Sequence, residues 1–128
     1  YKTCLISGGF QEVGDYFANE LGIDYVRANR LEIEEGKFTG NVEGDIIDAN
    51  KKAELLEDIS ANEGISLAQT IAVGDGANDV DMILEAGLGV SYYGQPVLKA
   101  ASDIRISYSN FRALLYCQGI RENEFVLE

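Results

Sequence analysis

The segment from Thr70 to Leu84, TIAVGDGANDVDMIL, carries carboxylates at a spacing that suits a metal or phosphate site. Its apolar residues 71–73 are typical of a strand covered on both faces, and glycines flank Asp75. Helical spacing begins at Asn78 or Asp79, so Asp75 is expected at the carboxyl end of a strand, with Asp79 beside it in the first helical turn. Ligand crevices of open α/β sheets lie at such strand ends, and all-oxygen ligation suits Mg²⁺.

Three other interpretations of this segment fit less well. A hairpin turn at Asp75-Gly76 would be followed by strand alternation, whereas helical spacing follows. An EF-hand loop would need glycine at Val80 and glutamate at Ala86. GDGAND is not the dinucleotide motif GxGxxG, because Asp79 takes the last glycine position, and neither GKS nor GKT occurs in the sequence. We therefore favour a metal or phosphate site over a structural turn.

A second group that could do chemistry is Ser7, which follows an apolar run and precedes two glycines and a predicted helix. Its hydroxyl and the amides of Gly8 and Gly9 suit an anion at a helix N-terminus. A tight turn from strand to helix explains the same residues equally well. The chain has no histidine, so Ser7 lacks a conventional base and is rejected as a nucleophile.

Two adjacent lysines open a third predicted helix, and helix geometry distinguishes them. At about 100° per residue, Lys52 falls near the centre of the apolar face, and Lys51 lies about a quarter-turn towards solvent. The residues that define this face are Leu55, Leu56 and Ile59. Lys52 could therefore reach a crevice and bind a phosphate, or extend its ammonium group to water, and these two interpretations stay open.

Composition limits the classes of protein that remain. The chain has 128 residues, enough for one domain at most, and a net charge of −12, which argues against nucleic acid or an anionic membrane as a partner. The lack of histidine excludes Ser-His-Asp and Cys-His catalysis and ordinary zinc sites. Cys4 and Cys117 are predicted to be buried thiols in a reducing cytosol, and no apolar run approaches membrane-spanning length. Because the chain opens with Tyr1 in a strand-like run, its start looks cut, which leaves room for an upstream targeting signal.

Predicted strands and helices alternate along the chain. Strands are expected at residues 3–6, 24–28, 71–73, 88–92 and 103–106, a hairpin at 31–42, and helices at 13–21, 49–63, 78–86, after Pro96 and at 110–117. This alternation predicts an α/β fold with a parallel sheet covered by helices on both faces. The tail at residues 121–128 is expected to be loosely held.

With these residues assembled, the chain resembles the haloacid dehalogenase superfamily of phosphatases, and within it the phosphoserine phosphatases. The resemblance covers nearly the whole chain, and GDGAND alone indicates the superfamily, whereas SGGF and the hairpin motif are narrower. The matching segments are LISGGF at 5–10, LGIDYVRANRLEI at 21–33, GKFTGNVEG at 36–44, the Lys52 helix, AVGDGANDVDM at 72–82 and, more weakly, AGLGV at 86–90. The implied fold is a three-layer Rossmann-like core with a parallel sheet and a small β-hairpin.

The resemblance implies Mg²⁺-dependent hydrolysis of a small phosphomonoester, O-phosphoserine, through an aspartyl-phosphate, as the last step of serine biosynthesis in the cytoplasm. Asp75 would bind Mg²⁺ directly, and Asp79 would hold a metal-bound water and the lysine. Lys52 would neutralise charge on the transferring phosphoryl group. The residues that would bind phosphate or substrate are Ser7, Gly8, Lys52 and Asn78.

The sequence departs from the family pattern in one respect. The family's nucleophile and general acid/base are two aspartates of a DxDx(T/V) motif on a first strand, and no such motif is present. Asp79 and Asp81 form the only DxD, and in a helix they point about 200° apart. The helical cap is missing too, and so is the first strand, which in the family is central between the strands carrying SGG and GDGAND. Residues 1–128 are therefore predicted to be a partial domain of a longer enzyme, inactive without its N-terminal part.

Two alternatives from other classes remain. The longer protein could act on another small phosphomonoester, or transfer the phosphoryl group to an acceptor, because the residues that select the substrate lie outside this chain. The chain could instead be a truncated relic that binds Mg²⁺ or phosphate without catalysis, which the missing nucleophile favours. The sequence leaves the oligomeric state open.

Overall fold

The computed structural model describes residues 1–126. The chain divides into two compact units, Tyr1–Leu67 and Ala68–Glu128, and each is described by itself. The expectation that residues 1–128 form one partial domain stays a prediction. No described helix is long and apolar enough to cross a membrane.

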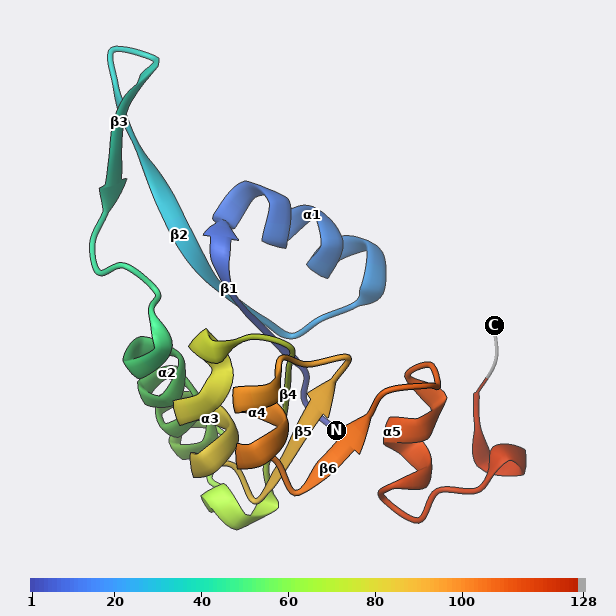
Figure 1. Cartoon of the computed structure of the whole chain (residues 1–128). Coiled ribbons are helices and arrows are strands. Elements are labelled where there is room, and N and C mark those ends of the chain that lie inside the picture. The colour runs from blue at the N-terminus through green and yellow to red at the C-terminus, as the bar shows by residue number, and fades with distance from the viewer. Residues whose placement is uncertain (127–128) are drawn as a thin grey trace. The chain divides into compact units, whose positions relative to one another are not determined.

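The first unit is a three-stranded sheet with two helices (Figure 1). Strands β1 and β2 run parallel, and β2 and β3 are antiparallel, in the order β1-β2-β3. Their bounds are β1 Cys4–Phe10, α1 Gln11–Leu21, β2 Tyr25–Glu34, β3 Lys37–Glu43 and α2 Ala49–Asn62.

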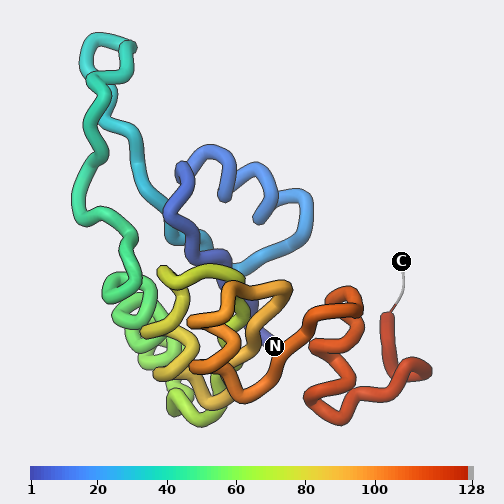
Figure 2. The backbone as a smooth tube through the Cα atoms, viewed as in Figure 1, coloured from blue at the N-terminus to red at the C-terminus, as the bar shows by residue number. Residues whose placement is uncertain are grey.

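Strand β2 is longer than the sequence indicates. The predicted strand at 24–28 and the first arm of the predicted hairpin form one continuous strand of ten residues. The hairpin itself is confirmed, and Glu35 and Gly36 turn it with φ angles of 52° and 76°. Figure 2 shows the long arms of β2 and β3 ending in this tight turn.

Helix α1 packs on the sheet through its smallest side chains. Gly14 and Ala18 are its buried residues, and a Cβ atom at Gly14 would lie 2.8 Å from a methyl carbon of Val26 in β2. Gly22, with a φ of 70°, ends the helix as predicted. The apolar residues whose helical spacing the sequence shows are exposed: Val13, Phe17 and Leu21.

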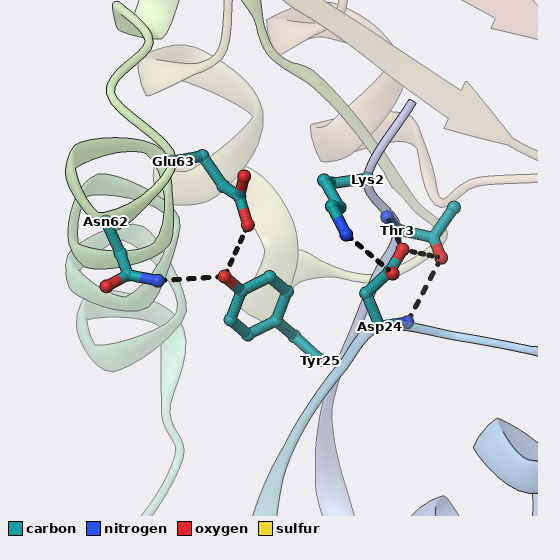
Figure 3. A network of polar contacts seen from close by, with 6 residues as sticks. All are labelled: Lys2, Thr3, Asp24, Tyr25, Asn62 and Glu63. Carbon is teal, nitrogen blue, oxygen red and sulfur yellow. Dashed lines mark hydrogen bonds and ion pairs between the residues drawn. The ribbon is translucent and has the colours of Figure 1, made fainter.

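A polar network ties the start of the chain to the start of β2 (Figure 3). The Asp24 carboxylate accepts hydrogen bonds from the backbone N–H of Thr3 at 2.9 Å and from the Lys2 ammonium group at 3.2 Å. The hydrogen bond from Thr3, followed by the one from Lys2, lowers the pKa of Asp24 below its ordinary value. These contacts fix the entry of β1 beside β2.

The same network holds the end of α2 (Figure 3). The Tyr25 hydroxyl donates to the Glu63 carboxylate at 2.5 Å and accepts from the Asn62 amide at 2.8 Å. The hydrogen bond to Glu63 raises the pKa of Tyr25. Helix α2 is thereby fastened to β2 at its C-terminal end, far along the helix from Lys52.

The second unit is a parallel sheet in the order β4-β5-β6. Figure 1 shows α3 and α4 side by side over β4 and β5, and the core between them includes Ile83, Val90 and Leu98. The elements are β4 Ile71–Gly74, α3 Val80–Glu85, β5 Leu88–Tyr92, α4 Pro96–Ala101, β6 Ile104–Ile106 and α5 Arg112–Tyr116, with 3-10 turns at Leu67–Gln69, Ala77–Asp79 and Glu122–Glu124. The predicted α/β class with parallel strands is confirmed. Of the tail predicted to be loosely held, residues 127–128 lie outside the described residues.

The prediction of two buried cysteine residues is wrong, because Cys4 and Cys117 are both exposed. Cys4 lies on β1, an edge strand of its sheet, and Cys117 caps α5, a short helix with no buried residue. The Cys4 sulfur is nevertheless desolvated enough that burial raises the pKa of its thiol to about 11.

This raised pKa predicts slow alkylation of Cys4. The thiolate is the nucleophile, so iodoacetamide labelling of a Cys117→Ser variant should rise about tenfold per pH unit from pH ~7 to ~10. Intact-mass measurement of the labelled fraction over time gives the rate at each pH. A rate that levels off near pH ~9 would mean an ordinary cysteine and would contradict the prediction.

Candidate functional site

Ser7, Gly8 and Gly9 lie within β1 rather than after it. The predicted strand ended at these residues, but β1 continues to Phe10. Ile6 pairs with Arg27 and Phe10 with Asn29, so four steps along β1 match two along β2, and the register shifts between them. The SGG segment is therefore a bulge, and we call residues 7–9 the SGG bulge.

The SGG bulge presents polar groups of the kind that bind anions. Gly8 and Gly9 are exposed and Ser7 is half-buried. The Ser7 Oγ accepts a hydrogen bond from the Gly9 N–H at 3.0 Å, which leaves the hydroxyl hydrogen able to donate elsewhere. The hydrogen bond from Gly9 to Ser7 is what a purely structural role of these residues would give. The anion-binding role stays a prediction.

Two side chains that sequence reasoning missed make hydrogen bonds at the register shift: Asn29 of β2 bonds the bulge itself, and Gln11 of α1 bonds the facing strand β2. Asn29 Nδ2 donates to the Gly8 carbonyl at 2.9 Å, and its Oδ1 accepts from the Ile47 N–H at 2.9 Å. Gln11 Oε1 accepts from the Ala28 N–H at 3.0 Å. The only sequence signal was an asparagine within a strand that is otherwise rich in apolar and long side chains.

Lys52 is positioned by the first turn of α2. The Asp48 carboxylate accepts from the Lys51 N–H at 2.8 Å, so Asp48 caps the helix as predicted. Lys52 is only 6% exposed, as the apolar face predicted. Lys51 lies outward, with its ammonium group 3.3 Å from both the Asp45 and the Glu54 carboxylates, and these contacts raise its pKa. The geometry of the two lysines is confirmed, and the phosphate role of Lys52 stays a prediction.

In the second unit, Asp75 follows the last residue of β4 and is exposed, as the sequence predicts for a residue at a strand's carboxyl end. Asp79 is 5% exposed, and its Oδ2 accepts from the N–H groups of Asp75 and Gly76 at 3.0 and 3.2 Å. The buried carboxylate thus shapes the loop that displays Asp75. Asn78 lies on the same loop and is exposed.

Gln95 is a further residue of this loop that the sequence did not single out. Its Oε1 accepts from the Ala77 N–H at 3.2 Å, and its own N–H donates to the Asp75 carbonyl at 2.9 Å. The loop after β4 is therefore fixed by Asp79 from within and by Gln95 from the start of α4.

Gly74 is required by the close approach of Asp79. A Cβ atom at Gly74 would lie 2.5 Å from the Asp79 Cβ and 2.6 Å from its Oδ2. Gly74→Ala should therefore lower the free energy of unfolding by about 1–3 kcal/mol and displace the Asp79 carboxylate. Urea unfolding measures the change, and a variant as stable as the wild type would contradict this account of the loop.

The donor set fits Mg²⁺ as part of a site. Asp75 offers an exposed carboxylate at a fixed strand end, and Asn78 offers an amide oxygen on the same loop. Mg²⁺ takes one or two carboxylates and fills its other positions with water and phosphate oxygens. Among the described residues no three acidic, cysteine or histidine side chains cluster, so these residues do not form a full metal cage by themselves.

The predicted site residues fall into two sets. The first unit holds the predicted phosphate-binding residues Ser7, Gly8 and Lys52. The second unit holds Asp75, Asn78 and Asp79. Within the first unit, the bulge lies against the segment leading into α2, since a Cβ at Gly8 would be 3.6 Å from the Ile47 carbonyl oxygen.

A parallel α/β fold with a glycine-flanked aspartate at a strand end is matched by a known family. The model of the haloacid dehalogenase-like hydrolases matches residues 1–84, and the chain belongs to this family. The resemblance drawn from the sequence motifs is thereby confirmed.

Particular relatives are phosphoserine phosphatases. That of Methanocaldococcus jannaschii is 44% identical over 115 residues, covering 90% of this chain and 54% of the relative. That of Archaeoglobus fulgidus is 48% identical over 114 residues, covering 89% of this chain and 33% of the relative. A substrate-bound phosphoserine phosphatase structure superposes with a TM-score of 0.84 at 43% identity, over 94% of this chain and 57% of that one. The chain thus spans about a third to a half of the length of these two relatives.

Proposed function

We propose that this chain is the phosphate- and metal-binding part of a longer Mg²⁺-dependent enzyme that hydrolyses O-phosphoserine in the cytoplasm. The observation that carries the proposal is the identity of 44–48% with phosphoserine phosphatases over about nine-tenths of the chain. The missing N-terminal part would supply the DxDx(T/V) aspartates and the helical cap. We call the chain joined to that part the longer protein.

In this proposal the first unit binds the transferring phosphoryl group. The Ser7 hydroxyl and the N–H of the exposed Gly8 would donate hydrogen bonds to its oxygens. Lys52, largely withdrawn from water on α2, places a positive charge where negative charge develops. The backbone near both groups is held by hydrogen bonds from β2, at Gly8 in the bulge and at Ile47 before α2.

The second unit contributes the metal-binding carboxylate. The Asp75 carboxylate would hold Mg²⁺, and the ion would supply charge stabilisation to the phosphoryl group when bound. Asp79 keeps the loop in the shape that displays Asp75, because its carboxylate accepts hydrogen bonds from two backbone N–H groups of the loop. Asn78, exposed on the same loop, would contact the substrate.

The first experiment is to sequence the gene for about 120 codons upstream of Tyr1, roughly the length the missing strand and cap would occupy in a domain of ordinary size. A DxDx(T/V) motif after an apolar strand supports the proposal and identifies the nucleophile. A reading frame that starts at Tyr1 would overturn it in favour of a binding role.

The substrate is tested separately, with the longer protein and a panel of small phosphomonoesters in the presence of Mg²⁺. Phosphate release should be fastest from O-phosphoserine. Preference for another phosphomonoester, or transfer of the phosphoryl group to an added alcohol, would replace phosphoserine in the proposal. Steady hydrolysis by the purified 128-residue chain would contradict the claim that the nucleophile lies outside it.

A second candidate is a chain that binds Mg²⁺ or phosphate without turnover. The lack of a DxDx(T/V) motif in this sequence favours it. This candidate predicts phosphate binding in calorimetry by a polypeptide that has no hydrolytic activity in any length the gene encodes.

A further inference from the structure

We propose that Asn29 is a positioning residue that holds the SGG bulge and the start of α2 in one fixed arrangement. The inference rests on the proposed function, in which the bulge and Lys52 bind the same phosphoryl group. Asn29 touches neither substrate nor metal in this proposal and acts through Gly8 and Ile47.

Asn29 supplies hydrogen-bond partners where the bulge interrupts the ladder between β1 and β2. Where β1 takes four steps against two on β2, the regular exchange of ladder hydrogen bonds between the strands is interrupted. Buried backbone groups without partners are costly, and the two N–H groups that side-chain amides satisfy here belong to the buried residues Ala28 and Ile47. Side-chain amides replace the missing ladder bonds: Asn29 donates to the Gly8 carbonyl, and Gln11 accepts from the Ala28 N–H.

Both ends of the Asn29 amide have fixed partners. Asn29 is 8% exposed, with its Nδ2 on the Gly8 carbonyl and its Oδ1 on the Ile47 N–H. Turning the amide over would place oxygen against the carbonyl and nitrogen against the N–H, so only one orientation satisfies both. The side chain therefore links two backbone positions that lie 39 residues apart in the sequence, Gly8 and Ile47.

The second of these positions determines where α2 begins. Ile47 is buried and directly precedes the capping residue Asp48, whose carbonyl accepts from the Lys52 N–H at 3.0 Å. Any shift of Ile47 would move the first turn of α2 and Lys52 with it. Asn29 thus couples the position of the bulge to the position of the lysine, which a purely stabilising residue would not need to do.

The test uses the longer protein with Asn29→Asp and Asn29→Ala. Aspartate keeps an acceptor for the Ile47 N–H and loses the donor to Gly8, whereas alanine loses both. At a temperature well below each variant's unfolding midpoint, we expect the inhibition constant for inorganic phosphate and the KM for phosphomonoester to rise about tenfold in both. The kcat should fall in both variants, because alanine releases the bulge and the start of α2, and aspartate sets a carboxylate oxygen against the Gly8 carbonyl.

A double-mutant cycle with alanine variants tests this role without the charge that aspartate adds. It also distinguishes an effect through the bulge from a general loss of stability. If Asn29 acts through the bulge, Ser7→Ala combined with Asn29→Ala should lose less than the product of the single losses. Asn41→Ala, in the exposed hairpin, is the control and should leave kcat and KM within about twofold. Folded Asn29 variants that keep kcat, KM and phosphate inhibition within about twofold would overturn the inference.

The outcomes distinguish this inference from the proposed function. If the wild type hydrolyses phosphoserine and the folded Asn29 variants do so equally well, only the inference fails. If the wild type prefers another phosphomonoester and the variants lose phosphate binding, the inference stands and the phosphoserine proposal fails. If the wild type neither binds inorganic phosphate nor hydrolyses any phosphomonoester, both are overturned.

Discussion

Lys52→Met in the longer protein is expected to lower kcat for phosphomonoester hydrolysis by about two to three orders of magnitude. The cationic residue Lys52 is buried at the start of α2, just after the segment that Asn29 holds through the Ile47 N–H. Such a charge acts most strongly where water is excluded and where negative charge grows in the transition state. Methionine has a similar volume and carries no charge, so it removes the electrostatic contribution and preserves most of the packing.

The neighbouring lysine provides a matched control. Lys51 lies on the same helical turn but points outward, to the exposed Asp45 and Glu54 carboxylates. Lys51→Met should leave kcat within about twofold, because exposed ion pairs contribute little. Phosphate release at saturating substrate measures kcat, and the unfolding midpoint shows that each variant is folded. Equal effects of the two substitutions would contradict the assignment of Lys52.

The difference between these lysines was predictable from the sequence because it depends on helix geometry alone. The angle of each residue around a helix follows from its position relative to Leu55 and Ile59, and the cap at Asp48 follows from residue type. The placement of Asp75 was equally local, since a short apolar run followed by glycine-flanked aspartate defines a strand end. The roles of these residues in catalysis remain predictions.

Features that depend on pairing between distant segments were not predictable in this way. The contacts of Asn29 with Gly8 and Ile47 follow from a register shift between β1 and β2, which no local pattern reveals.

The side of α1 that faces the sheet was not predictable either. The helical spacing of its apolar residues correctly predicted the helix, but Phe17 and its apolar neighbours are exposed, and Gly14 and Ala18 are the buried residues. Periodicity predicts a helix but does not by itself say which side is covered.

Asp75→Asn is expected to reduce Mg²⁺-dependent activity of the longer protein by about three orders of magnitude or more. Asparagine has nearly the same shape but removes the exposed carboxylate charge that Asp75 places at the end of β4. A hard divalent cation binds far more weakly to a neutral amide than to a carboxylate. The Asp75 side chain makes none of the described hydrogen bonds that hold the loop, since those use its backbone N–H and carbonyl, so stability should change little.

Asp81→Asn is the matched control, because Asp81 is exposed on α3 and carries the same charge a short distance along the chain. Mg²⁺ binding, measured by calorimetric titration, should be lost in Asp75→Asn and kept in Asp81→Asn. The Mg²⁺ dependence of phosphate release should change in the same way. Added Mg²⁺ should restore little of the wild-type kcat to Asp75→Asn, because the carboxylate charge at position 75 is missing however much metal is present. If instead both variants bind Mg²⁺ as the wild type does, the metal is held wholly by the proposed N-terminal part, and Asp75 has no part in the site.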